Sequence, residues 1–112
     1  MKETLHVNGT LGEEKYLVEI KTTNHTIMVD EPISIGGSDS FPNPAQYLLT
    51  ALASCTAVTI KMYANDKGWD IGIINVDVKL KDVLSEGKSV KKMVKTVQFE
   101  KLIDDSQVER LL

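Results

Sequence analysis

The sequence has 112 residues, of which 42% are hydrophobic and 26% are charged, which is typical of one globular domain spanning residues 1–112. Its 13 basic and 16 acidic residues give a net charge of −3, which argues against a nucleic-acid or membrane partner. One cysteine excludes an intramolecular disulfide and a cysteine-rich zinc site, and we expect a cytoplasmic protein without a metal or cofactor. Lys91, Lys92 and Lys95 form the densest basic patch, and the apolar residues that alternate with them predict a solvated strand face.

The first thirty residues are expected to form a meander of three short strands. Residues 3–10 and 14–22 are rich in β-branched and apolar side chains, and a glycine-containing turn separates them. Over residues 16–21, Tyr16, Val18 and Ile20 alternate with Leu17, Glu19 and Lys21, which is typical of a half-buried strand. A third strand is predicted over residues 26–29.

A long helix is predicted after a loop over residues 31–43 that is rich in Gly and Pro. Asn43 can cap the helix, and Pro44 suits its first position because the missing N–H costs nothing there. The helix should run over residues 44–67 and end at Gly68. Its apolar residues recur at three- and four-residue steps, and further apolar residues lie off this stripe, so other elements should surround it on nearly all sides. The stripe comprises Leu48, Ala51, Leu52, Cys55, Val58, Thr59 and Met62.

The last part of the sequence predicts a hairpin followed by a helix. Residues 70–102 alternate between apolar and polar side chains on both sides of a turn at Gly87. Residues 105–112 predict the start of a C-terminal helix. The whole order is an α+β fold, with an antiparallel sheet wrapped around a long central helix. Because one sheet can cover only one side of that helix, a second copy of the chain is the simplest cover for the other side.

Cys55 lies in the middle of the predicted helix, on its apolar stripe. Pattern alone favours a small buried hydrophobe over a reactive thiol. The residue is three turns from the helix start, so activation would have to come from another segment. Its neighbours Ala51, Ala53, Ser54 and Ala57 are small, which would let another helix or a substrate approach closely. The preceding loop could form a lip over such a pocket.

The run GGSDSFPNPAQYLLTALASCTAVTIKMYANDKGW, residues 36–69, resembles the OsmC/Ohr family of osmotically inducible and organic hydroperoxide resistance proteins. The matching features are the glycine pair, the Pro-Asn-Pro opening of the helix, ALASCT around Cys55 and the ending KGW, which is closest to the OsmC-like branch. The strand pattern on both sides also fits. The resemblance implies an intertwined homodimer in which two long helices pack between the sheets and the active sites form at the dimer interface.

The resemblance also implies thiol-dependent reduction of organic hydroperoxides. Cys55 matches the peroxidatic cysteine, which attacks the peroxide and becomes a sulfenic acid. Pro42, Gln46 and Leu49, at and before the helix start, are the predicted substrate contacts.

Other parts of the family's machinery have no counterpart in this sequence. The family's glutamate falls at Ala45 or Gln46, and neither side chain can carry a negative charge. The family's arginine is missing from residues 1–44, where Lys15 is the cation near the hairpin turn. The family's second cysteine would lie beyond Leu112, so the chain resembles a C-terminally short member that an external thiol would have to regenerate.

Three hypotheses follow for the function. The protein is a thiol peroxidase for organic hydroperoxides, or it is catalytically silent and binds a small apolar ligand at the dimer interface. In the third hypothesis two Cys55 thiols pair across the dimer axis as a redox sensor, which requires Cα atoms within about 7 Å of each other.

Overall fold

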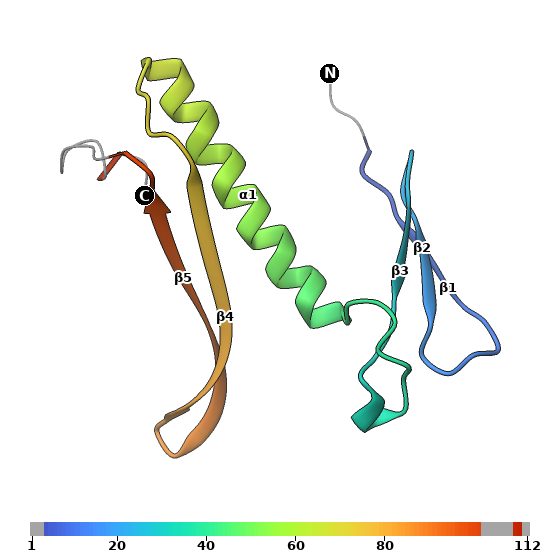
Figure 1. Cartoon of the computed structure of the whole chain (residues 1–112). Helices are drawn as coiled ribbons and strands as arrows, with labels where there is room; N and C mark the ends of the chain where they lie inside the picture. The colour runs from blue at the N-terminus through green and yellow to red at the C-terminus, as the bar shows by residue number, and fades with distance from the viewer. Residues whose placement is uncertain (1–3, 102–108, 111–112) are drawn as a thin grey trace. The chain divides into compact units, whose positions relative to one another are not determined.

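A computed structural model describes residues 4–101 and 109–110 of the chain (Figure 1). The chain divides into two compact units, Met1–Leu48 and Leu49–Leu112, and each is described by itself. Antiparallel sheets and one long helix make up the structure, which confirms the predicted α+β class.

The first unit is built on a three-stranded antiparallel sheet in the order β1-β2-β3 (Figure 1). The strands are β1 (Asn8–Leu11), β2 (Val18–Lys21) and β3 (Thr26–Val29). The first two are shorter than predicted. Asn8 of β1 pairs with Lys21, the last residue of β2, so the residues before Asn8 have no partner strand. Tyr16 has a φ of 65°, a left-handed conformation that delays the start of β2.

A buried carboxylate organises the loop that follows β3. Asp30 is 2% exposed, and its two carboxylate oxygens accept hydrogen bonds from the backbone N–H groups of Glu31 (2.8 Å) and Ser40 (3.1 Å). Its own backbone N–H donates to the carbonyl of Pro42 at 3.2 Å. Between these anchors lies a short 3-10 helix, η1 (Ile33–Ile35). One side chain therefore ties the two ends of a ten-residue loop together.

These hydrogen bonds predict that the loop is sensitive to acid. The N–H groups of Glu31 and then Ser40 hold the pKa of Asp30 below its ordinary value of 3.8. A lowered pKa means that the carboxylate stabilises the fold at neutral pH and that this contribution is lost as the pH falls below about 4. We expect faster hydrogen exchange at the Ser40 amide below that pH, relative to amides of β2. In Asp30→Asn the acid-dependent step should disappear and exchange should be fast at neutral pH; an unchanged Ser40 amide would contradict this role.

The long helix α1 (Pro44–Lys67) begins and ends as predicted. At its start Asn43 and Gln46 form a reciprocal capping box, in which each side chain accepts a hydrogen bond from the other's backbone N–H, at 2.8 and 3.0 Å. At its end Gly68 adopts a φ of 73°, and the backbone N–H of Trp69 returns to the carbonyl of Ala64 at 2.8 Å.

The second unit combines α1 from Leu49 onward with a long antiparallel hairpin of β4 (Ile74–Ser85) and β5 (Lys88–Phe99) (Figure 1). A two-residue turn joins the strands, and both of its residues, Glu86 and Gly87, have positive φ. Such a turn matches the natural twist of a hairpin. The predicted turn at Gly87 is confirmed.

The core of the second unit lies where the helix ends and the hairpin begins. Ile60, Ala64 and Ile71 are buried there. The partly buried side chains that pack against them are Trp69, Ile74, Val97 and Phe99. The predicted C-terminal helix lies mostly outside the described residues, although Glu109 and Arg110 are helical. Arg110 stacks on the rings of Tyr63 and Trp69, at 5.9 and 5.6 Å.

Candidate functional site

The thiol of Cys55 is exposed in the middle of α1. Its Sγ lies 4.0 Å from the hydroxyl oxygen Oγ1 of Thr59, one turn later on the helix. The hydroxyls of Ser54 and Thr56, on either side of Cys55 in the sequence, donate hydrogen bonds to backbone carbonyls of the preceding turn. The expectation from pattern alone, a buried Cys55, is therefore wrong for the single chain.

Cys55 is the centre of an exposed apolar strip, which we call the thiol face and define as Ala51, Cys55, Val58, Thr59 and Met62. Val58 and Met62 are 51% and 67% exposed. At about 100° per residue, Ile60 and Ala64 project from the opposite side of the helix, and these are the residues that pack on the hairpin. The chain's own hairpin thus packs on the side of α1 away from the thiol face, and the thiol face itself is left open.

Length and composition alone would let α1 cross a membrane. Only 11% of its most apolar window is buried, so a single chain does not cover this helix. The core helix of a protein without a membrane span can have the same length and composition. A helix of this kind needs an apolar cover of some sort.

The three predicted substrate contacts lie at or before the start of α1. The Gln46 side chain takes part in the capping box with Asn43. Pro42 is exposed, and its carbonyl accepts the hydrogen bond from Asp30. Leu49 is half-buried on the helix. Their contact with a substrate stays a prediction.

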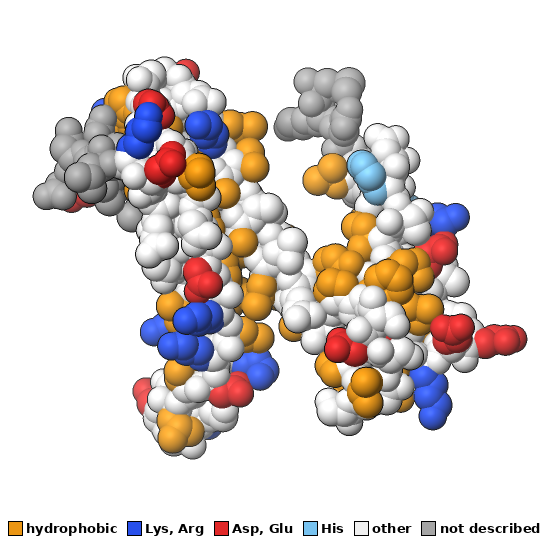
Figure 2. Space-filling model, viewed as in Figure 1, with side chains coloured by type: hydrophobic (Ala, Val, Ile, Leu, Met, Phe, Trp, Pro, Cys, Tyr) orange, Lys and Arg blue, Asp and Glu red, His pale blue; other side chains and the backbone are white. Residues whose placement is uncertain are grey.

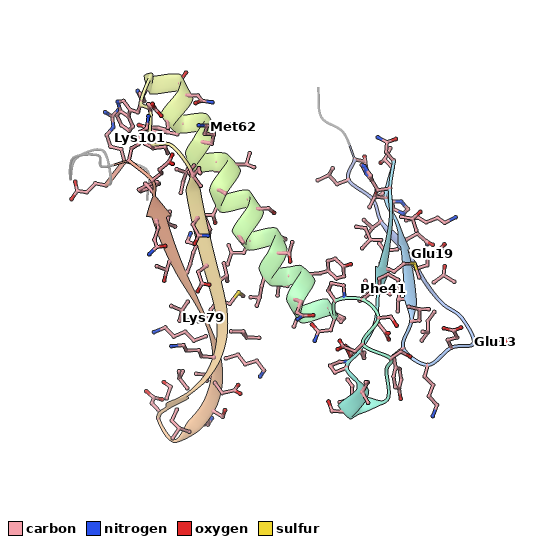
Figure 3. All side chains as sticks on the ribbon, in the orientation of Figure 1. Glu13, Glu19, Phe41, Met62, Lys79 and Lys101 are labelled. Carbon is pink, nitrogen blue, oxygen red and sulfur yellow. The ribbon has the colours of Figure 1, made fainter. Side chains whose placement is uncertain are left out.

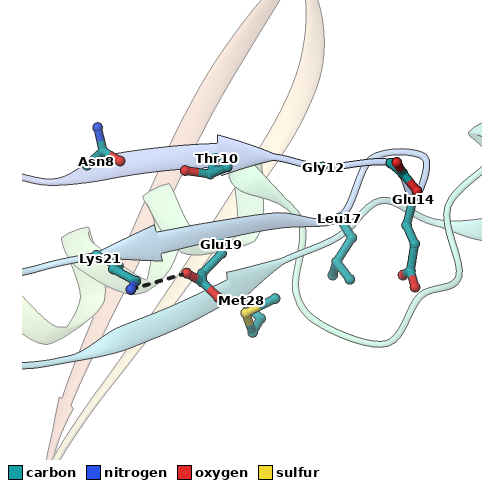
Figure 4. A pocket seen from close by; sticks show the side chains of 9 residues that line it. Asn8, Thr10, Gly12, Glu14, Leu17, Glu19, Lys21 and Met28 are labelled. Carbon is teal, nitrogen blue, oxygen red and sulfur yellow. Dashed lines mark ion pairs between the residues drawn. The ribbon is translucent and has the colours of Figure 1, made fainter.

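The sheet of the first unit has two different faces, each with a hollow. Thr10, Glu19, Lys21 and Met28 line a polar hollow of about 490 Å³ on one face (Figure 4). An apolar groove of about 360 Å³ lies on the other. The groove is lined by Val18, Ile20, Ile27, Val29, Pro44 and Tyr47. The alternation predicted over residues 16–21 is confirmed along β2, since Val18 and Ile20 line the groove while Glu19 and Lys21 line the hollow. Tyr16, with its left-handed backbone, precedes the strand.

Sequence reasoning missed two residues that shape this region. The hydroxyl of Tyr47 donates to the carbonyl of Met28 at 2.7 Å and so ties the first turn of α1 to β3. The second is Asp30, whose carboxylate is buried directly after β3 and anchors the following loop. A lone Asp between an apolar strand and a Gly/Pro-rich loop is the available signal for such an anchor.

No cluster of three or more His, Cys, Asp or Glu side chains that could hold a metal ion occurs among the described residues. Lys15, the cation near the N-terminal turn, is exposed in the first unit. His25 lies in the turn between β2 and β3, where its backbone N–H donates to the hydroxyl of Thr22 at 2.9 Å. Neither residue is part of the thiol face.

Solved structures with similar folds come from bacteria. An osmotic stress induced and detoxification response protein from Psychrobacter arcticus 273-4 gives a TM-score of 0.72 at 19% identity, over 99% of this chain and 81% of that chain. An organic hydroperoxide resistance protein from Elizabethkingia anophelis gives a TM-score of 0.72 at 15% identity, and the match covers 99% of this chain and 82% of that chain. Another such protein, from Vibrio cholerae O1 biovar eltor, has captopril bound in one of its active sites. It gives a TM-score of 0.69 at 16% identity, and the match covers 99% of this chain and 76% of that chain.

At these identities the structural likeness establishes a shared fold. No curated protein sequence matches the chain. The sequence profile of the OsmC-like proteins matches residues 37–112, which include the start of the long helix, Cys55 and the whole hairpin. The chain belongs to the OsmC-like protein family.

Proposed function

We propose that the protein acts in oxidative-stress defence as a homodimeric thiol peroxidase that reduces organic hydroperoxides. The observation that carries this proposal is the position of Cys55 at the centre of the exposed thiol face of α1, within the segment that matches the family. The names of the structural neighbours, which include organic hydroperoxide resistance proteins, support the substrate class.

The homodimer is supported by the open side of α1. Val58 and Met62 would each leave water if a second helix covered the thiol face. Burying a large aliphatic side chain contributes roughly 1.5–3 kcal/mol. The small side chain of Ala51 would let the second helix come close to Cys55. A pocket closed by a second chain would also exclude water from the thiol and favour peroxides with an apolar organic group.

The chemistry needs a thiolate and one external reductant. The Cys55 thiolate attacks the distal oxygen of the peroxide, the O–O bond breaks, and the alkoxide leaves and takes up a proton to become the alcohol. The cysteine is then a sulfenic acid. An external thiol condenses with it, releasing water and forming a mixed disulfide, and a second thiol restores the Cys55 thiol while the two external sulfurs form a disulfide. This need for external thiols supports a cytoplasmic location.

The direct test is oxidation of the reduced protein by cumene hydroperoxide, with hydrogen peroxide in parallel. Peroxide loss and the mass of the intact protein are measured together. We expect one equivalent of cumene hydroperoxide to be consumed at least about tenfold faster than by free cysteine, with one oxygen gained at Cys55. Cys55→Ser should react at the background rate. A wild-type rate equal to that of free cysteine would overturn the peroxidase.

The second candidate function is binding of a small apolar ligand without catalysis. The apolar groove of the first unit supports it, because six apolar or aromatic side chains line about 360 Å³. A slow thiol together with an apolar dye that binds wild type and Cys55→Ser equally would favour this function. A covalent dimer on a non-reducing gel after mild oxidation would favour the redox sensor.

A further inference from the structure

The register of the hairpin places lysines from both strands on one face. Residues directly opposite each other in an antiparallel pair share a face, and successive residues alternate between faces. Lys81 is opposite Lys92, Lys79 is opposite Val94, and Lys88 is opposite Ser85. We call the face that carries Lys79, Lys81, Lys88 and Lys92 the lysine face. The basic patch expected from sequence is thereby divided, because Lys91 and Lys95 lie on the other face.

The lysine face points away from the core of the second unit. Ile74 and Phe99 are opposite each other, as are Val76 and Val97, and Ile74, Val97 and Phe99 pack against the buried core. These side chains define the inner face of the hairpin. The lysine face is the other one, and Figures 2 and 3 show lysine side chains standing out from the hairpin. A second chain that covered the thiol face of α1 would leave it free.

Positive charge on the lysine face is only partly neutralised. In β4 and β5, which the structure describes completely, Asp77 is the one acidic residue on this face, and it lies 3.9 Å from Lys79. The other ion pair of the hairpin, Lys91 with Asp82 at 2.9 Å, lies on the inner face. Like charges directly opposite each other, such as Lys81 and Lys92, destabilise a strand pair. Lysines on an edge strand can also serve to prevent pairing with another chain. That role does not require them to lie on one face of the hairpin, as they do here.

Apolar side chains lie at the tip of the same hairpin. Val90 lies on the lysine face between Lys88 and Lys92 and is 41% exposed, whereas the more exposed Leu84 lies on the other face. Lysines that surround an exposed aliphatic residue fit a surface that is anionic outside and apolar beneath. Nucleic-acid surfaces instead favour Arg and exposed aromatic residues, and β4 and β5 contain no Arg and only the partly buried Phe99.

We propose that the lysine face and the exposed Val90 on it dock the protein on anionic phospholipid surfaces. The net charge of −3 does not reveal this local patch, because the lysines gather on one face only in the register of the hairpin. The lysines bind the headgroups, and Val90 inserts below them. The proposal concerns the second unit alone and is independent of the chemistry at Cys55. Cys55→Ser should therefore bind lipid as the wild type does, so failure of the peroxidase and failure of docking are separately observable.

The test is co-sedimentation of the protein with vesicles of phosphatidylcholine, alone or mixed with phosphatidylglycerol. We expect binding to the mixed vesicles only, with loss at high salt because the attraction is screened. The double variant Lys81→Gln/Lys92→Gln should bind roughly 25-fold more weakly, at about fivefold for each lysine. It removes a repulsive pair, so folding should not suffer. The matched control Lys15→Gln/Lys21→Gln makes the same charge change in the first unit and should bind as the wild type does.

Val90→Ser separates lipid docking from general attraction to anions. We expect it to weaken vesicle binding several-fold while leaving the salt dependence unchanged. Equal binding of the wild type to vesicles and to inorganic polyphosphate, with no effect of Val90→Ser, would overturn lipid docking in favour of a general polyanion surface. An equal loss of vesicle binding in the two double variants would also overturn lipid docking by the lysine face. Binding would then depend on the total charge of the protein and not on this face.

Discussion

Replacing Val58 by Asp is expected to convert the proposed dimer to a monomer in solution. Val58 is 51% exposed in the single chain and lies on the thiol face, beside Cys55. In the proposed dimer each chain would place one carboxylate in an apolar interface, and an unpaired buried charge costs several kcal/mol. Two such charges should raise the dissociation constant roughly a thousandfold or more. Sedimentation equilibrium at micromolar concentration measures this directly.

The control for this experiment is Lys67→Gln, which makes the same change in net charge on the same helix. Lys67 is exposed, and at about 100° per residue it lies on the side of α1 opposite Val58. It should leave the dimer intact. Because Val and Asp differ little in helix propensity, Val58→Asp should also keep the helical content of the wild type. A wild type that is monomeric at high concentration, or a Val58→Asp variant that remains dimeric, would contradict the proposed interface.

Much of the fold is predictable because its signals are local. Asn43 and Pro44 begin α1 and Gly68 ends it, since capping and the loss of an N–H act within one turn. The turn at Gly87 was similarly clear, because a two-residue hairpin turn needs positive φ. The face of α1 that the chain itself covers was not predictable. Ala64 is buried and Met62 is exposed, and the helix is apolar on both sides, so its pattern does not distinguish them.

The candidate site was also predictable only in part, because some of its features are local in sequence and others are not. The identity of Cys55 came from its local motif, and its exposure came from the structure. The anchors Asp30 and Tyr47 act across 10 and 19 residues of sequence, respectively. Side-chain bonds of that span depend on how the loop closes, which no local pattern encodes. The lysine face is of this kind too, since it requires the register that places Lys81 opposite Lys92.

Gly37→Ala is expected to be the most damaging single substitution in the first unit. A Cβ at this position would lie 2.0 Å from the carbonyl oxygen of Glu31 and 2.5 Å from its carbonyl carbon. Both are backbone atoms, so no flexible side chain can move aside. The same carbonyl oxygen accepts the N–H of Asp39 at 3.1 Å, and the N–H of Gly37 itself donates to Pro32 at 3.0 Å. The added methyl group must therefore separate the backbone at Gly37 from the backbone at Glu31 and so open the loop that leads into α1.

The expected loss is roughly 3 kcal/mol of unfolding free energy, at the upper end of overpacking effects. Urea denaturation followed by circular dichroism measures the loss, and hydrogen exchange at the Asp39 and Ser40 amides locates it in the loop. Gly12→Ala is the matched control, because a Cβ at that position meets nothing within 4 Å. It should change stability by less than about 0.5 kcal/mol. If Gly37→Ala proved as harmless as Gly12→Ala, the loop would not be held by the close approach of Gly37 to Glu31. The loop before α1 would then be free to change its conformation, and the hydrogen bonds of Asp30 alone would not suffice to hold that loop in place.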